Sequence, residues 1–135
     1  MLCAAIVSRN LQDRFADISG ALTEPYDKAP RGYLVLTPTR AVFFYTGGNR
    51  KFGTSVEDKA ALFDTIGAWS GTYRADGNKV VFSVDVSWTE NWNGTNVALN
   101  WQLSGNRLTL TRDRQPYARD PSKMVEIRQV WEKIE

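Results

Sequence analysis

The sequence predicts an all-β protein: an eight-stranded up-and-down antiparallel β-barrel with one short α-helix around residues 54–66. One observation is the strict alternation of the segment 78–88, NKVVFSVDVSW, because a period of two is typical of a half-buried strand. A second is that the same alternation recurs up to the C-terminus, interrupted by Gly, Asn, Asp and Pro. Such a meander must close or be covered, because open sheet edges invite aggregation. The apolar face of the segment carries Val80, Phe82, Val84, Val86 and Trp88.

The overall composition and charge of the chain exclude some classes of binding partner. A chain of 135 residues is expected to form one domain, residues 1–135. Its net charge is +2 and its basic residues are dispersed, so no nucleic-acid partner is expected. No segment approaches about 18 consecutive apolar residues, so no membrane partner is expected either. The lone Cys3 fits a reducing compartment, and residues 1–8 lack the basic start of a signal peptide, which together favour a cytoplasmic location.

The N-terminal half predicts three strands, the first of them weakly patterned. Residues 6–15 are assigned to that first strand, and residues 17–30, rich in Gly, Pro, Asp and Ser, to a long loop. Residues 32–37 form a strand without a polar face. A tight turn at residues 38–40 follows, because proline presets the dihedral angle at its second position. The chain then returns through a strand at residues 41–46.

The helix is predicted from its cap and its apolar spacing. Thr54 is placed as the N-cap with Glu57 three residues on, which is the capping-box arrangement. A lone amphipathic helix within a β meander is expected to cover a barrel end or one sheet face. The face at helical spacing comprises Val56, Ala60, Phe63 and Gly67.

The C-terminal half predicts the remaining five strands. Asp76-Gly77 is a strong hairpin signal, and Gly105-Asn106 marks another turn. Residues 112–123, polar and with two prolines, are assigned to a loop. The total of eight strands is the number that leaves room for side chains or one small ligand. The five strands are residues 68–75, 79–88, 96–104, 107–111 and 124–134.

From residue 29 onward the chain resembles the lipocalin-like domain family of small bacterial and fungal proteins. The matching motifs follow the family order: APRGYLVLTP, SVEDKAALFDTIGAWSGTYRADGNKVVFSVDVSW, NWNGT, LSGNRLTLT and VWEKI. The resemblance implies an up-and-down barrel around a small-molecule cavity. Three departures stand out: residues 1–10 replace the Gly-Thr-Trp opening, Phe82 and Ser83 stand where the family often has His, and Leu99 where it often has Arg. Each departure removes a polar group, which implies a more apolar cavity than in relatives.

The residue types limit the available chemistry. The chain contains no His, so Ser–His and Cys–His nucleophile pairs and most zinc sites are excluded, and we expect no metal and no cofactor. Tyr33, Tyr45 and Tyr73 carry phenols that orient a carbonyl or donate a proton, or else reach only backbone or water. Gln129 shares a face with apolar residues, so its amide requires a partner from protein, water or ligand.

The predicted ligand-binding set follows from strand parity, although residues 33–36 and 41–45 are apolar on both faces, which leaves their inward face open. The set comprises Tyr33, Phe44, Tyr45, Trp69, Tyr73, Phe82, Val84, Trp88, Leu99, Trp101 and Gln129.

Three functions remain open. The first is a protein that binds a small, largely apolar molecule inside the barrel. The second is a cofactor-independent isomerase, cyclase or lyase acting on an apolar secondary metabolite in the same cavity, with Tyr73, Tyr45 and Gln129 as catalytic candidates. The third is an interaction module, in which the helix at 54–66 or an N-terminal edge strand mediates dimerisation. The sequence leaves open whether the protein is a monomer or a homodimer.

Overall fold

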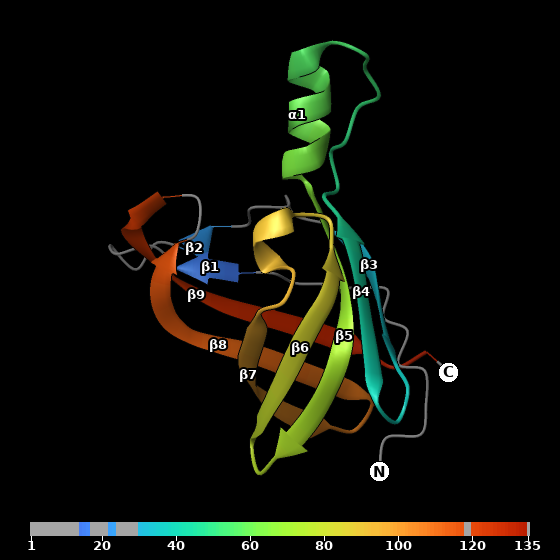
Figure 1. The fold of residues 1–135 in the computed structure, drawn as a ribbon, viewed down its shortest axis with the longest axis vertical. Helices are drawn as coiled ribbons and strands as arrows, with labels where there is room; N and C mark the ends of the chain where they lie inside the picture. Colours follow the sequence, from blue (N-terminus) through green and yellow to red (C-terminus); the bar gives the residue numbers. More distant parts are fainter. Residues whose placement is uncertain (1–13, 17–21, 24–29, 118–119, 135) are drawn as a thin grey trace.

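The structure is a computed structural model, and it describes residues 14–16, 22–23, 30–117 and 120–134. Most of the strand predicted at residues 6–15 lies outside these residues, as does most of the loop predicted at 17–30. The described chain is an antiparallel meander with one α-helix and one 3-10 helix (Figure 1). The prediction of an all-β, up-and-down antiparallel fold is therefore confirmed.

Among the described residues, seven long strands form the wall of the barrel, so the predicted number of eight is wrong. Two short strands, β1 (Arg14–Ala16) and β2 (Leu22–Thr23), extend the same sheet beyond β9, in the order β2-β1-β9-β8-β7-β6-β5-β4-β3. The long strands are β3 (Arg31–Leu36), β4 (Arg40–Thr46), β5 (Ile66–Asp76), β6 (Lys79–Ser87), β7 (Asn96–Ser104), β8 (Arg107–Tyr117) and β9 (Asp120–Glu132).

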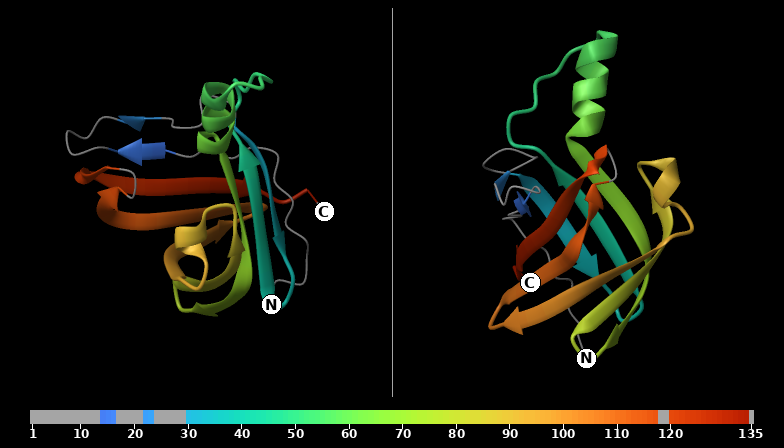
Figure 2. Two further views of the ribbon diagram at one scale, coloured as in Figure 1. Left: turned by 45° about the horizontal axis from the view of Figure 1, so that its top comes forward. Right: turned by 90° about the vertical axis from the view of Figure 1, so that its left-hand side faces the viewer.

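The sheet curls into a nearly closed barrel (Figure 2). Trp131 of β9 and Phe43 of β4 are far apart in the strand order, yet their ring centroids lie 5.8 Å apart across the interior. Strands β2 and β3 form the two edges of the sheet within the described residues. Side chains from both halves of the sheet therefore meet in the interior, and the buried apolar residues of the described chain form one core cluster.

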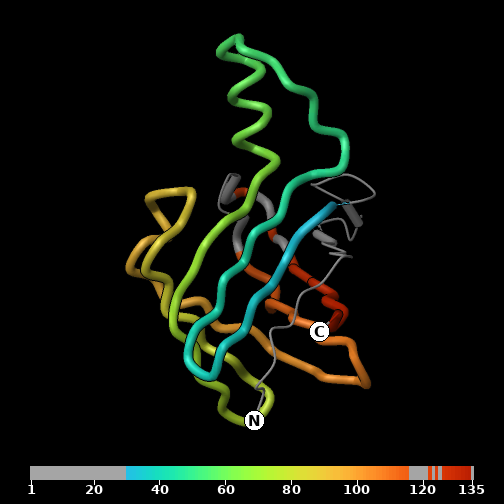
Figure 3. The backbone as a smooth tube through the Cα atoms, turned by 90° about the vertical axis from the view of Figure 1, so that its right-hand side faces the viewer, coloured from blue at the N-terminus to red at the C-terminus, as the bar shows by residue number. Residues whose placement is uncertain are grey.

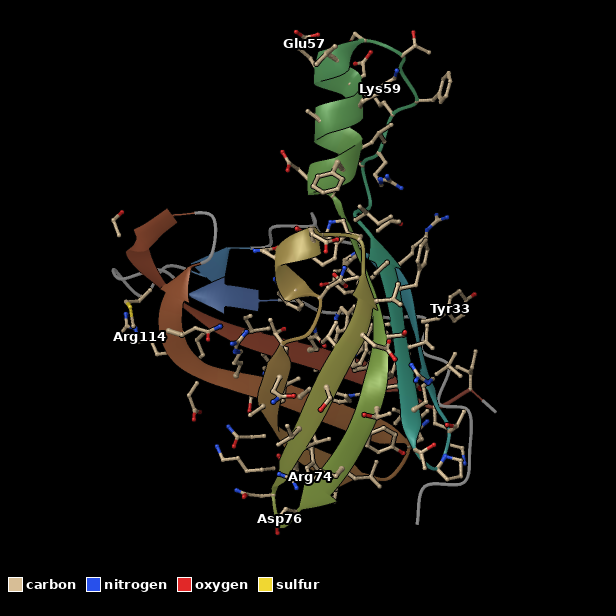
Figure 4. The ribbon with its side chains drawn as sticks, in the orientation of Figure 1. Tyr33, Glu57, Lys59, Arg74, Asp76 and Arg114 are labelled. Atoms are coloured by element: carbon tan, nitrogen blue, oxygen red, sulfur yellow. The ribbon has the colours of Figure 1, made fainter. Side chains whose placement is uncertain are left out.

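Strand β4 shows which face of the sheet is inward. Ala41, Phe43 and Tyr45 are buried, whereas Val42 and Phe44 are 41% and 48% exposed. The sequence alone did not show which of these two faces is inward, because both faces of this strand are apolar. Hydrogen-bonded register with β3 pairs Phe44 with Tyr33, which is also on the outer face (Figure 4).

A β-bulge in β6 changes the parity of its last residues. Ser70 pairs with Val86 and Gly71 with Val84, so Asp85 is the extra residue. Val84 is buried, but Val86 is 65% exposed. The prediction that Val86 shares the inward face of Val84 is therefore wrong, because one inserted residue reverses the alternation beyond it.

The bulge is held by a carboxylate on the outer face. Asp85 accepts a 2.7 Å hydrogen bond from Arg40 Nη1 and a 2.9 Å hydrogen bond from Ser70 Oγ. The hydrogen bond from Arg40 is the main cause that holds the pKa of Asp85 below its ordinary value of 3.8, and Ser70 is the second. The folded chain therefore stabilises the ionised form of Asp85 relative to the unfolded chain.

We expect Asp85→Asn to destabilise the protein at neutral pH and to lose that effect in acid. The folded-state pKa lies below the unfolded one, so the stabilisation is present above pH 3.8 and disappears as the pH falls through the lower, folded value. Urea unfolding of wild type and variant at several pH values measures the difference. Glu126→Gln, which removes an exposed carboxylate from β9, serves as the control; a pH-independent difference for Asp85→Asn contradicts this account.

Helix α1 (Val56–Asp64) projects from one end of the barrel (Figures 1 and 3). Its N-cap is Ser55, whose Oγ accepts from the Asp58 N–H at 3.0 Å while Asp58 Oδ2 accepts from the Ser55 N–H at 3.2 Å. The predicted cap at Thr54 is thus one residue early. None of the helix residues is buried, so the expectation that the helix covers the barrel is also wrong.

Strands β8 and β9 are longer than predicted. The loop expected at residues 112–123 instead belongs largely to a continuing hairpin, with pairs such as Gln115–Val125 and Pro116–Met124. The register shifts near Arg112 and near Pro116. Bulges tolerate proline and irregular polar patterning, which explains why this part of the sequence indicates a loop.

Candidate ligand-binding site

Four aromatic rings pack the middle of the barrel. Phe43 stacks on Trp69 with ring centroids 4.1 Å apart and planes inclined by 16°. Phe82 meets both rings edge-on at 5.3 and 5.2 Å, and Trp131 meets Phe43 edge-on at 5.8 Å. These rings fill the space at this level with side chains in contact, as in an ordinary core. The middle of the barrel is therefore filled by protein side chains at this level.

We call the end that carries α1 and η1 (Glu90–Trp92) the upper end (Figure 1). Here Trp88 and Trp92 meet edge-on with centroids 5.6 Å apart. Trp92 lies 6.4 Å from Trp69, and Phe63 at the end of α1 lies 6.5 Å from Trp88. A continuous row of aromatic rings thus runs from the projecting helix to the packed middle of the barrel.

Backbone hydrogen bonds fix the loop that presents these two tryptophans. The Trp88 N–H donates to the Ala68 carbonyl at 2.8 Å, and the Gly94 N–H donates to the Val84 carbonyl at 2.9 Å. Gly94 has a φ of 75°, a conformation that glycine adopts without steric cost. Both tryptophans are half-buried against the core, so they combine a fixed position with partial exposure.

Two polar atoms of this loop are buried without a hydrogen-bond partner. They are Trp88 Nε1, a donor, and Asn93 Oδ1, an acceptor. The amide orientation of Asn93 is set by its Nδ2, which donates to Glu90 Oε2 at 3.0 Å. Leaving such a group unsatisfied costs about 1–3 kcal/mol. The upper end therefore offers one donor and one acceptor beside its aromatic surface.

The two tyrosines that face the interior do not meet at one point. Tyr45 pairs with Gly67 near the upper end of β5, and its ring lies over that glycine. Tyr73 is six residues further along β5, roughly 20 Å away at about 3.3 Å per residue. Its hydroxyl donates to the Thr37 carbonyl at 2.6 Å, which is the backbone partner that the sequence left as an alternative.

The Gln129 side chain, on the inner face of β9, forms a hydrogen bond within the protein. Its Oε1 accepts from Trp131 Nε1 at 3.3 Å. Phe82, Val84 and Leu99 are buried on the inner side, and Trp101 is half-buried against the core. Tyr33 and Phe44 lie on the outer face. Trp88 lies beyond the bulge, where the predicted parity no longer holds, and is half-buried against the core.

Sequence reasoning missed Arg112. It alternates with Leu108 and Leu110, both buried, and is therefore directed to the inner face of β8. The two-residue spacing of Leu108, Leu110 and Arg112 already indicated an inward position for Arg112. The polar composition of residues 112–123 instead favoured a loop.

A hollow of about 320 Å³ lies on the outside of the sheet. Asn100, Gln102, Thr109 and Thr111 alternate with inward residues, so their side chains give this hollow a polar, outward-facing wall. Its lining residues are Asn78, Asn100, Trp101, Gln102, Thr109 and Thr111.

A nearly closed antiparallel meander with an aromatic interior defines the class of small barrel proteins to which lipocalins belong. The model of the lipocalin-like domain family matches residues 11–134, and the chain belongs to that family. No curated protein and no solved structure matches the chain. Among the described residues, no helix has the length and apolar character needed to cross a bilayer, and no group of three potential metal ligands occurs.

Proposed function

We propose that the protein binds a small, largely apolar molecule at the upper end of the barrel, between the packed aromatic layer and η1. Membership of the lipocalin-like domain family supports a ligand in the barrel. The observation that carries the location is the row formed by Phe63, Trp88 and Trp92, which meets the core at Trp69. Flat half-buried rings are the surfaces that bind apolar molecules with high contact area.

The polar atoms of the loop favour a ligand with limited hydrogen-bonding capacity rather than a pure hydrocarbon. Trp88 Nε1 supplies a donor and Asn93 Oδ1 an acceptor, and both lack a partner in the described structure. A ligand group such as a carbonyl or hydroxyl that reaches either atom satisfies it and gains orientation. Such a ligand is apolar over most of its surface and polar at one or two positions.

The test uses N-phenyl-1-naphthylamine, a neutral probe whose emission rises in an apolar site and which accepts energy from nearby tryptophan. We expect saturable binding by the wild type. Trp92→Ala should raise the dissociation constant about tenfold, since removing a central aromatic contact costs more than about 1 kcal/mol. The control is Phe52→Ala, which removes an aromatic side chain that is 93% exposed and should leave binding unchanged.

Two results contradict the proposal. One is that the folded wild type shows no saturable binding of the probe. The other is that Trp92→Ala and Phe52→Ala bind the probe with the affinity of the wild type, which places the probe elsewhere. Urea unfolding of each variant shows whether the barrel is intact.

A further inference from the structure

Arg112 brings a positive charge to the inner face of the barrel. It follows Leu108 and Leu110, which are 4% and 1% exposed, at the same two-residue spacing. The paired register of β7 with β8 ends at Asn100–Thr111, so Arg112 is the first inward residue beyond that ladder, on the side of β8 that leads to the upper end. Its side chain is half-buried.

Within the described residues, the Arg112 guanidinium forms neither a hydrogen bond nor an ion pair. Asp113, the adjacent acid, points to the outer face, where it accepts from Asn100 Nδ2 at 3.0 Å and lies 3.7 Å from Lys79 Nζ. Burial lowers the pKa of Arg112, yet an arginine stays charged throughout the range in which proteins fold. An unpaired, partly desolvated cation is costly.

Its neighbours within the described residues supply further N–H donors. Leu110, two residues before Arg112, pairs with Trp101 on β7 and with Gln129 on β9. Trp101 Nε1 is buried without a partner. Gln129 Oε1 accepts from Trp131 Nε1, and the same amide carries an NH₂ donor. Three side chains on adjacent strands thus present N–H groups around one inner-face position.

We propose that Arg112 binds the carboxylate head group of the apolar ligand, so that the ligand is an anionic amphiphile; this rests on the proposed function. A guanidinium matches a planar carboxylate with two parallel hydrogen bonds. One cation balances a single negative charge, which favours a carboxylate over a doubly charged phosphate ester. The apolar body of the ligand then extends from β8 toward Trp88 and Trp92 at the upper end.

The experiment compares decanoate, decanol and decylamine as competitors of N-phenyl-1-naphthylamine at neutral pH. The three share one apolar chain and differ in head group. We expect decanoate to displace the probe from the wild type at a concentration about 10- to 100-fold lower than decanol, as charge-assisted hydrogen bonds provide. Decylamine should compete more weakly than decanol, because its charge repels Arg112.

Two variants assign the preference. Arg112→Met should abolish the advantage of decanoate over decanol while leaving decanol unchanged. Its free energy of unfolding should not fall, because the change removes an unpaired, half-buried charge. Arg107→Gln, which removes an exposed charge from the same strand, should retain the full preference.

The outcomes separate this inference from the proposed function. If decanoate and decanol compete equally in the wild type, the proposal of an anionic ligand is wrong, whereas the proposal of an apolar ligand is retained. A preference for decanoate that persists in Arg112→Met overturns the role of Arg112. Absence of probe binding in the wild type overturns both the proposed function and the inference.

Discussion

Phe43→Ala is expected to lower the free energy of unfolding by about 3–5 kcal/mol, the cost typical of truncating a buried phenylalanine. Phe43 is 1% exposed and contacts three other rings of the packed layer, so its removal leaves a void at the centre of the barrel. The loss includes its stacking with Trp69 at 4.1 Å, because such pairs contribute beyond their buried area. Urea unfolding followed by circular dichroism measures the change.

The matched control is the next residue. Phe44→Ala removes the same side chain from the same strand, but Phe44 is 48% exposed on the outer face. We expect a loss of less than about 1 kcal/mol, as for most surface substitutions. Equal losses for the two variants, or a larger loss for Phe44→Ala, contradict the assignment of the inward face of β4.

Gly71→Ala is expected to destabilise the protein by about 1–3 kcal/mol, because a side chain there overpacks the β5–β6 ladder. A Cβ atom on Gly71 would lie too close to the backbone carbonyl of Ser83, at the point where the bulge draws the two strands together. Backbone cannot move aside as a flexible side chain does, so the ladder must shift. The shift also disturbs Asp85, which the bulge presents to Arg40.

The control for this prediction is Gly48→Ala. Gly48 is exposed in the loop after β4 and is not among the glycines with positive φ. Alanine at such a position leaves stability unchanged or raises it slightly, because it restricts the unfolded chain. Thermal unfolding of both variants makes the comparison. A Gly71→Ala protein as stable as the wild type contradicts the close approach of β5 and β6 at the bulge.

The sequence predicted the fold class well where one face of a strand is polar. Phe82 and Leu99 lie inward as the alternation indicates, because Ser83 and Asn100 supply a clear contrast on the other face. Parity failed at Val86, because a bulge inserts one residue without leaving a signal in hydrophobicity. Alternation did not show whether Phe44 faces inward or outward, since both faces of β4 are apolar. Only the curl of the sheet determines which face is buried.

The candidate site was predicted in part. Trp88 was expected near the ligand, and the structure joins it to Trp92 and Phe63 through ring contacts that no sequence spacing reveals. The predicted hollow is not confirmed in the middle of the barrel, since the number of aromatic residues does not show whether they line a space or fill it. Arg112 was missed because charge outweighed periodicity when residues 112–123 were assigned to a loop.

The most direct test of ligand binding at the upper end is ¹⁹F NMR of protein labelled with 5-fluorotryptophan. The five tryptophans, each assigned by substitution with phenylalanine, report from different levels of the barrel. On titration with N-phenyl-1-naphthylamine, the resonances of Trp88 and Trp92 should shift with one saturation curve while that of Trp131, which is fully buried in the packed layer, stays in place. A saturable shift of Trp131 with Trp88 and Trp92 unmoved, or no saturable shift at all, contradicts a ligand site at the upper end.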